Sequence, residues 1–396
     1  MTEMINPACP SSLLLILAGA KGAIGSTVAT AAAAIQSNPE FILSSLTTAD
    51  AFSFLPPPEA IRVVGWDTSV SNLPELIEKH GVLPETAWQP HRAELEKTVI
   101  LAPPDGHLPL AGQVEKLRQD IRFFREKYPN SAAVFVNLLP AGLLTDLDEY
   151  ESFDQLYSQV DGSLFPDLAY ALAAVFSGIP VVNFTPNHLE FPLLLNEAVT
   201  RNVPVAGRDG KTGQTYLKVV LASALKARSL LVDGWYSVNI LGNADGENLM
   251  NPDHAAGKLK NKTELLDDLL GYPVGKRYGA PSHKVRIDYY PPRGDAKEAW
   301  DVIDFSGMFG LPMSLRLNLL GRDSILAAPL VVDLARWVAA LQLAGRSGLI
   351  SELGFFFKAP LGTHPPLTFQ DQFMQLEWLK MACEEKMAGK SPGLPV

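Results

Sequence analysis

The hydrophobic positions in the first half of the chain alternate between two patterns. Short and fully apolar runs, such as residues 13–18 and 132–139, are typical of strands that are buried on both faces. Between them, apolar residues recur at helical spacing, as they do over residues 113–128. Further strands are predicted at 61–64 and 179–184, an exposed loop at 56–58, and further helices at 28–35, 168–176 and 189–199. This succession of strands and helices predicts an α/β fold with a Rossmann-like, doubly wound parallel sheet.

The pattern changes after residue 206. Alternating apolar and polar residues at 284–290 and 314–319 predict half-buried strands of an antiparallel sheet. A strongly apolar helix is predicted at 327–343 and an amphipathic one at 370–386. We therefore divide the chain into a Rossmann-like domain at 1–208, an inserted α+β domain at 209–324, and a segment at 325–396 that returns to the first domain.

Composition limits the classes of protein. The 396 residues are 47% apolar and 19% charged, which argues against long disordered regions. Lys and Arg number 33 against 43 Asp and Glu, and this net charge of −10 disfavours nucleic acid and anionic membrane surfaces as partners. The apolar run near the N-terminus is too short to span a bilayer, and two cysteines cannot build a disulfide framework. We expect a cytoplasmic protein without a membrane span.

A glycine turn follows the first predicted strand. Gly19, Gly22 and Gly25 are three residues apart, which differs from the usual dinucleotide fingerprint, but the physical requirement is the same. Backbone N–H groups without a nearby Cβ can approach a pyrophosphate, and the N-terminus of the following helix adds partial positive charge. Asp67, after the second strand, can accept hydrogen bonds from ribose hydroxyls. The turn indicates a dinucleotide site; the alternative is a tight turn without a ligand.

The second half of the chain carries short polar motifs that suit an anion. They are Asp209 to Thr215, Asn239 to Gly246, the pair Lys258 and Lys262, Gly294 to Lys297, Asp323-Ser324, and Lys358 at the end of an aromatic run. Desolvation beside that run would lower the pKa of a lysine toward a catalytic range. The alternatives are a solvated helix face for the lysine pair and an edge position for Lys358. The seven histidines lack zinc-ligand spacing, and no nucleophile elbow occurs.

These motifs, taken in order, resemble those of the myo-inositol-1-phosphate synthase family, also called inositol-3-phosphate synthases. The matching stretches are Gly65-Trp-Asp67, Gly207-Arg-Asp209, Thr212-Gly-Gln-Thr215, Leu241-Gly-Asn-Ala-Asp-Gly246, residues 258–268, Gly294-Asp-Ala-Lys297, Asp323-Ser-Ile-Leu-Ala-Ala-Pro329 and Phe357-Lys-Ala-Pro360. The resemblance implies an NAD-dependent isomerase whose substrate is a sugar phosphate such as glucose 6-phosphate. In the family, C5 is oxidised, the C6 carbon loses a proton, the enolate closes on the C1 aldehyde, and the ring ketone is reduced.

The resemblance also implies roles for individual residues. Lys258 and Lys297 would act at O5, Lys358 at the aldehyde oxygen, Asp295 as a partner of the lysines, and Asp323 in proton relay. Substrate would be held by Lys262, Thr212, Gly213, Gln214, Asn239, Asn243 and Asp245. NAD would be held by Gly19, Gly22, Ala23, Ile24, Gly25, Ser26, Asp67, Thr185, Asp209, Asp323 and Ser324. The 1–208 domain would bind NAD, and the 209–324 domain would carry catalysis and the association of a homotetramer.

The chain departs from the family at several positions. Tyr216 replaces a lysine, and Thr185-Pro-Asn187 replaces a longer polar motif. These differences leave open a cyclase for another aldose phosphate, an NAD-dependent polyol-phosphate dehydrogenase, and a binding protein without catalysis. A divalent or monovalent activating cation is also left open.

Overall fold

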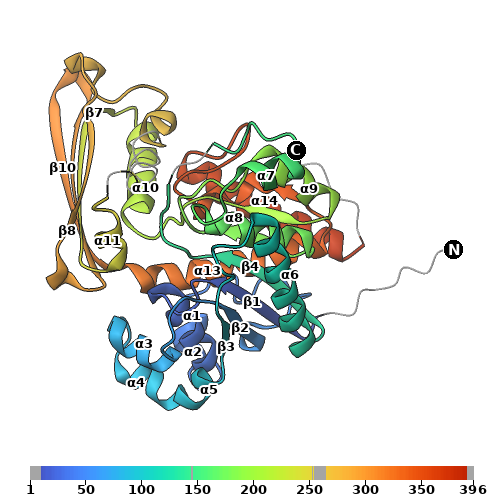
Figure 1. Ribbon diagram of the computed structural model, residues 1–396. Coiled ribbons are helices and arrows are strands. Elements are labelled where there is room, and N and C mark those ends of the chain that lie inside the picture. The colour runs from blue at the N-terminus through green and yellow to red at the C-terminus, as the bar shows by residue number, and fades with distance from the viewer. Residues whose placement is uncertain (1–9, 144–145, 252, 254–264, 390–396) are drawn as a thin grey trace.

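Two β-sheets organise the molecule (Figure 1). The computed structural model describes residues 10–143, 146–251, 253 and 265–389. One sheet has seven strands and forms the centre of the larger body, whereas the other has four strands and stands beside it. Helix α10 lies between the second sheet and the rest of the molecule.

The seven-stranded sheet is parallel in every pairing and has the order β11-β6-β5-β4-β1-β2-β3. Its strands are β1 (Ser12–Ala18), β2 (Ile61–Trp66), β3 (Val99–Leu101), β4 (Ser131–Asn137), β5 (Val181–Asn183), β6 (Pro204–Ala206) and β11 (Gly348–Leu349). The predicted doubly wound, Rossmann-like fold is confirmed.

Helices cover both faces of this sheet. They include α1 (Ala23–Ala34), α6 (Leu110–Lys127), α8 (Pro166–Phe176), α9 (Pro192–Thr200), α13 (Asp323–Leu343) and α14 (Phe369–Met387). In β1, Leu13, Leu15 and Leu17 pack with α1 and α13, whereas Leu14, Ile16 and Ala18 pack with α6 and α8. Because both faces of the strand are buried, its sequence is continuously apolar rather than alternating.

Further helices complete this body and the connection to the second sheet. They are α2 (Pro39–Leu43), α3 (Leu73–His80), α4 (Glu85–Trp88), α5 (Arg92–Glu96), α7 (Phe153–Gln159), α10 (Gln214–Ala227) and α11 (Ala244–Asn248). Helix α13 is long and apolar enough to cross a membrane by length and composition, but 78% of its most apolar stretch is buried in the structure. This burial is typical of a core helix.

The second sheet is mixed and has the order β10-β9-β7-β8. Its strands are β7 (Leu231–Leu241), β8 (His283–Tyr289), β9 (Ala296–Ser306) and β10 (Pro312–Arg322). Strand β10 is antiparallel to β9, as predicted, but β8 runs parallel to β7, so the antiparallel prediction is wrong for residues 284–290. Alternation reports burial of one face and carries no information about strand direction. The domain boundaries at 208/209 and 324/325 stay a prediction.

The loop predicted to be exposed at residues 56–58 is largely buried, because α13 holds it. Pro57 is exposed, but Pro56 and Pro58 are buried. The guanidinium of Arg336 donates to the carbonyl oxygens of Thr48, Ala51 and Pro56, with the last bond 2.7 Å long. These bonds satisfy backbone carbonyls that would otherwise be buried without a donor.

Candidate active site

The candidate site lies at the carboxyl edge of the seven-stranded sheet. Strands β2 and β3 extend from β1 in one direction, while β5, β6 and β11 extend from β4 in the other. The chain connections therefore reverse between β1 and β4, and in doubly wound sheets ligands bind in the crevice at this point. The turn after β1, Asp67 after β2, Thr185 after β5 and Asp209 after β6 all follow carboxyl ends of strands.

The turn between β1 and α1 leaves its backbone open to an anion. Gly19 has a φ of +83°, which favours glycine, and a Cβ on Gly25 would lie 2.6 Å from the Gly19 carbonyl oxygen. Gly22 is the N-cap of α1, which has no side-chain cap and no acidic residue in its first turn. Ala23, Ile24, Gly25 and Ser26 form that first turn. Uncapped N–H groups at a helix N-terminus suit a pyrophosphate, so these residues fit a dinucleotide.

Asp67 is held beside this turn. Its Oδ2 accepts from the backbone N–H of Lys21 at 2.9 Å, and its Oδ1 accepts from that of Ser69 at 2.9 Å. Lys21 Nζ in turn donates to the Ser69 and Ser71 carbonyl oxygens at 2.6 and 2.8 Å. Lys21 was not predicted as a residue of the site, although its place between Gly19 and Gly22 indicates that it belongs to the turn. The carboxylate of Asp67 is thus fixed at the end of β2.

Lys358 and Asp209 form a buried ion pair. Lys358 Nζ donates to Asp209 Oδ1 at 2.6 Å, and Lys358 N donates to the Asp209 carbonyl oxygen at 2.7 Å. The flanking backbone continues this contact, because Gly210 and Phe357 form an antiparallel bridge. Asp209 N also donates to the Thr185 carbonyl oxygen at 2.9 Å, which ties the pair to the end of β5.

A second cluster joins Thr212, Lys297 and Asp323. Asp323 Oδ1 accepts from Thr212 Oγ1 at 2.7 Å and from Lys297 Nζ at 3.3 Å. Asp209 and Thr212 are three residues apart, so their Cα atoms lie at most about 11 Å from each other. One short segment, residues 209–212, therefore connects the two lysine–aspartate pairs.

Asp295 has a different partner from the one expected among the described lysines. Its Oδ1 accepts from Ser324 Oγ at 2.7 Å, whereas Lys297 pairs with Asp323. Its Oδ2 is buried without a hydrogen-bond partner. Burial, together with the neighbouring Asp323 carboxylate, raises the pKa of Asp295 against the lowering effect of Ser324. Spacing in the sequence could not tell which of the two aspartates, Asp295 or Asp323, pairs with Lys297.

Close packing of two glycines joins two further motifs. A Cβ on Gly242 would lie 2.4 Å from the Gly294 nitrogen, so the residues around Asn243 lie against those around Asp295. Asn243 Oδ1 caps α11 by accepting from Gly246 N at 3.1 Å, and Asp245 lies within that helix. Asn239 on β7 is fully buried, and both atoms of its amide lack a partner. An unpartnered buried amide is a candidate ligand contact.

Gln214 belongs to a buried network that sequence reasoning missed. Its Nε2 donates to Asp301 Oδ2 at 2.9 Å, and Asp301 Oδ1 accepts from Trp235 Nε1 and Ser237 Oγ. The sequence offered little indication of this network, because β9, which carries Asp301, was not predicted as a strand. Gly213 is the N-cap of α10, which has no side-chain cap and no acidic residue in its first turn. This second open helix N-terminus could accept a phosphate.

Lys258 and Lys262 lie outside the described residues. Among the residues that the structure describes, no group of three His, Cys, Asp or Glu side chains could hold a metal ion.

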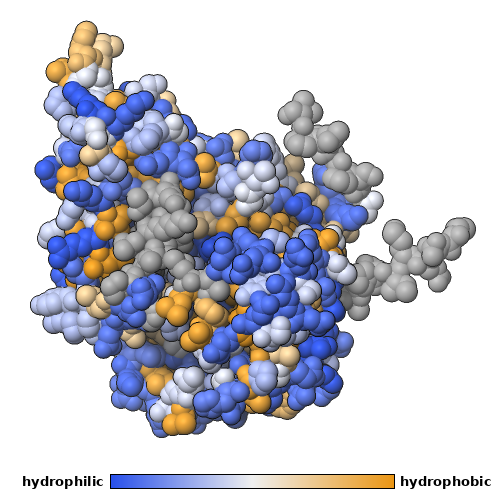
Figure 2. Space-filling view, turned by 45° about the horizontal axis from the view of Figure 1, so that its top comes forward, coloured by the Kyte–Doolittle hydropathy of each residue, from blue (hydrophilic) through white to orange (hydrophobic). Residues whose placement is uncertain are grey.

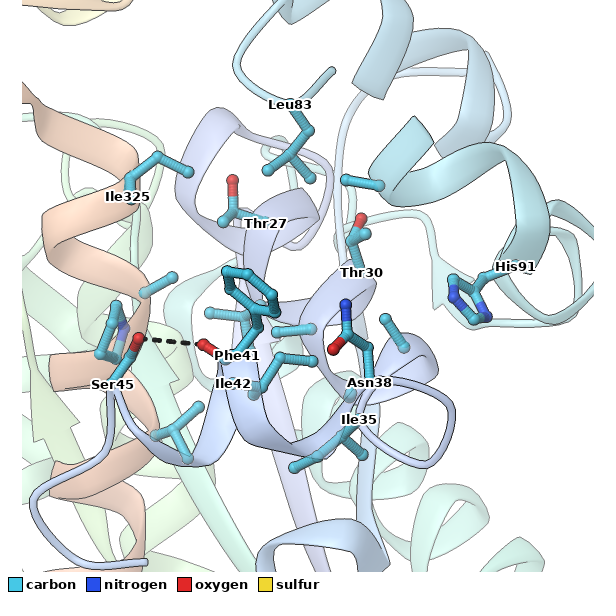
Figure 3. A pocket seen from close by; sticks show the side chains of 18 of the residues that line it. Thr27, Thr30, Ile35, Asn38, Phe41, Ile42, Ser45, Leu83, His91 and Ile325 are labelled. Atoms are coloured by element: carbon cyan, nitrogen blue, oxygen red, sulfur yellow. Dashed lines mark hydrogen bonds between the residues drawn. The ribbon is translucent and has the colours of Figure 1, made fainter. Parts of the chain in front are cut away.

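A cavity lies away from these residues. It has a volume of about 730 Å³ and lies between α1, α2, the α3–α4 connection and α13 (Figure 3). Its lining includes Thr27, Phe41, Leu83 and Ile325, and none of the predicted site residues. Because it borders the body of α1 and not the carboxyl edge of the sheet, we do not assign it to the active site.

The described site can do electrostatic and proton-transfer chemistry. Two ammonium groups, Lys297 and Lys358, pair with the carboxylates of Asp323 and Asp209, and the 209–212 segment that connects the two pairs leads directly into the open N-terminus of α10. Preorganised cations in a desolvated site stabilise oxyanions that develop during a reaction.

Comparisons with known proteins identify the family of this chain. The family model described as myo-inositol-1-phosphate synthase matches residues 213–324. The chain is similar to inositol-3-phosphate synthase 1 of Bacteroides thetaiotaomicron, with 38% identity over 288 residues that cover 70% of this chain and 67% of that protein. It is 29% identical to an inositol-3-phosphate synthase of Spirodela polyrhiza over 369 residues, or 82% of this chain and 71% of that one.

Solved structures share the fold. The inositol-3-phosphate synthase of Caenorhabditis elegans superimposes with a TM-score of 0.83 at 23% identity, covering 98% of this chain and 90% of that one. A myo-inositol-1-phosphate synthase-related protein from Thermotoga maritima has a TM-score of 0.73 at 19% identity, covering 97% and 100%.

Proposed function

Because the chain belongs to the myo-inositol-1-phosphate synthase family, a family of isomerases, we propose that it cyclises glucose 6-phosphate to an inositol phosphate with NAD as cofactor. The observation that supports this most is the convergence of the Lys297–Asp323 and Lys358–Asp209 pairs on one segment. Cyclisation develops negative charge at two substrate oxygens, O5 and O1, and preorganised cations can stabilise both of them.

NAD, when bound, would accept a hydrogen with its electron pair from C5 and return it to the ring ketone. The residues that would hold it are the first turn of α1 with Gly19 and Gly22, together with Asp67, Thr185, Asp209, Asp323 and Ser324. The open N–H groups of α1 fit the pyrophosphate. The Asp67 carboxylate, which backbone N–H groups fix at the end of β2, fits the ribose hydroxyls.

Lys297 is proposed to stabilise the charge at O5. Its ammonium lies 3.3 Å from Asp323 Oδ1, so Lys297 can pass one of its own protons to this carboxylate as it takes up the proton that leaves O5. Thr212 Oγ1 donates to the same oxygen and fixes its orientation. Asp295 and Lys258 are proposed to assist there.

Lys358 is proposed to stabilise the charge that develops at O1 when C6 attacks the C1 aldehyde. Its pairing with Asp209 fixes the ammonium in one position before the reaction, which is what electrostatic stabilisation requires.

The phosphate is proposed to lie at the open N-terminus of α10, with Gly213, Gln214 and Lys262. Asn239 and Asp245 are proposed to hold the sugar hydroxyls, and Asn243 to hold the phosphate. The buried and unpartnered amide of Asn239 supports this assignment.

The substrate can be tested with a panel of aldose phosphates, each incubated with the enzyme and NAD and then reduced with borohydride. A linear aldose phosphate gains two hydrogens, whereas a cyclitol phosphate has no carbonyl and keeps its mass. We expect borohydride-resistant product of unchanged mass from glucose 6-phosphate. Such product from another aldose phosphate alone would support the alternative cyclase, and accumulating NADH without it would support a dehydrogenase.

Gly25→Ala is expected to weaken NAD binding by at least about 10-fold, because the new Cβ would meet the Gly19 carbonyl oxygen at 2.6 Å and displace the turn. Isothermal titration calorimetry measures the affinity. Gly112→Ala in α6 is the matched control, since its Cβ would make only ordinary contacts at 3.7 Å or more. Equal affinity in the two variants would exclude this turn as the pyrophosphate site.

A homotetramer is proposed from the second sheet. Its edge strand β10 and its neighbour β9 expose large apolar side chains: Trp300 is 50% exposed and Leu320 is 65% exposed. Figure 2 shows hydrophobic side chains among hydrophilic ones on this part of the surface. An uncovered apolar edge strand favours pairing with another copy. Native mass spectrometry should give four copies and, for Trp300→Glu with Leu320→Glu, fewer; a monomeric native chain would contradict the proposal.

A further inference from the structure

Lys211 is a buried lysine whose amino group has an amide, and not a carboxylate, as its partner. The residue is 3% exposed, and Nζ donates to Gln372 Oε1 at 2.7 Å. Nζ also lies 5.6 Å from the centroid of the Phe355 ring. Burial lowers the pKa of Lys211 to about 7. Among the described residues, the structure shows no ion pair for this side chain.

A buried amine of this kind is unfavourable for stability. Removing an ammonium from water without an opposite charge carries a large desolvation penalty, and an apolar side chain of similar length would avoid it. Groups that break a local rule of stability without compensation are expected at functional positions. Lys211 is therefore a candidate for a functional role.

Its place in the chain indicates which role. Lys211 lies between Asp209, which pairs with Lys358, and Thr212, which bonds to Asp323. Its backbone N–H donates to the Phe356 carbonyl oxygen at 2.8 Å. The side chain itself reaches helix α14, so it acts on the segment that carries the site and not on the reacting atoms.

Gln372 is built to receive this side chain. It is fully buried in α14, and its Nε2 donates to the carbonyl oxygens of Pro366 and Leu367 at 3.0 and 3.4 Å. Those bonds fix the amide so that its oxygen faces Lys211. The contact spans 161 residues of sequence and connects the C-terminal helix to the 209–212 segment.

An aromatic cluster lies against this contact. Tyr216 packs edge-to-face on Phe355 and Phe369, with ring centroids 6.2 and 6.1 Å apart. Phe355 is the ring beneath the Lys211 ammonium. Tyr216 stands where the family resemblance expects a lysine, so in this chain an aromatic ring at that position packs α10 against the start of α14.

We propose that Lys211 is a positioning residue that, through Gln372, anchors the 209–212 segment to helix α14 and thereby aligns the Lys358–Asp209 pair with the Lys297–Asp323–Thr212 cluster. This inference rests on the proposed function, because it concerns the alignment of the groups that act on the substrate.

Lys211→Met tests the inference, since methionine keeps an unbranched apolar chain and loses the donor. We expect kcat for cyclisation to fall by at least about 10-fold and KM for glucose 6-phosphate to change by less than about 2-fold, because misalignment affects the reacting groups more than substrate binding. The melting temperature should be unchanged or higher. Gln372→Leu should give the same loss of kcat, and the double variant should lose no more than either single variant.

Lys226→Met is the matched control, because Lys226 is a lysine of α10 whose Nζ donates to a backbone carbonyl outside the site. It should keep the kcat of the native enzyme. A second measurement does not depend on catalysis: hydrogen–deuterium exchange at the amides of residues 209–211 should be faster in Lys211→Met than in Lys226→Met. Native kcat in Lys211→Met, or equal exchange in the two variants, would overturn the inference. Failure of the proposed function would instead appear as a native enzyme that forms no cyclic product.

Discussion

Lys297→Ala should lower kcat for glucose 6-phosphate cyclisation by at least about 100-fold while NAD stays bound. The ammonium of Lys297 is the described cation that bonds to Asp323, and the loss removes both charge stabilisation at O5 and the route of its proton to the carboxylate. Because Lys297 is a side chain of the second sheet and the cofactor turn belongs to the first, NAD affinity should change little. Steady-state formation of inositol phosphate and calorimetric titration with NAD measure the two effects.

Lys284→Ala provides the control for this variant. Lys284 lies on β8 of the same sheet and is exposed, so its removal changes net charge equally without touching the site. Turnover equal to the native value in Lys297→Ala would exclude a catalytic role for this lysine.

Lys358→Ala should also lose at least about 100-fold in kcat, and it should lose stability as well. The variant removes the cation proposed for O1 and leaves the carboxylate of Asp209, which is 2% exposed, without its lysine. Removing one partner of a buried ion pair lowers the free energy of unfolding by about 3 to 5 kcal/mol, because the remaining charge is left buried. Thermal unfolding and turnover should therefore both change.

A double variant separates the two effects. In Asp209→Asn with Lys358→Met, no charge of the pair is left buried, so much of the stability should return while activity stays low. If activity returned together with stability, Lys358 would be a structural residue and the assignment to O1 would be wrong.

The parallel sheet could be predicted because burial on both faces leaves a direct mark on sequence. The run at residues 13–18 is apolar throughout, and the structure divides its side chains between two cores. The direction of β8 could not be predicted, since alternation is the same for a parallel and an antiparallel strand. The burial of Pro56 and Pro58 depends on Arg336, which lies 280 residues beyond Pro56 in the chain.

The site could be predicted as a set of residues but not as a set of pairs. The order of the motifs predicted that one candidate site contains Thr212, Lys297, Asp323, Asp209 and Lys358. Which carboxylate meets which amine depends on how the side chains are placed in three dimensions, and the pairing of Lys297 with Asp323 instead of Asp295 is an example. The network around Asp301 was missed because β9 lacks a clear apolar alternation. Lys211 lies within the polar motif at residues 209–215, but its spacing indicates no separate role for it.

Glucose 6-phosphate that carries deuterium at C5 gives the most direct measurement of the proposed reaction. The enzyme is supplied with less than one equivalent of NAD per equivalent of substrate, and the products are analysed by mass spectrometry and NMR. We predict complete conversion to a cyclic inositol phosphate that retains the deuterium, because the hydrogen removed from C5 is returned within the same turnover. Accumulation of deuterated NADH without a cyclic product would contradict the proposed function.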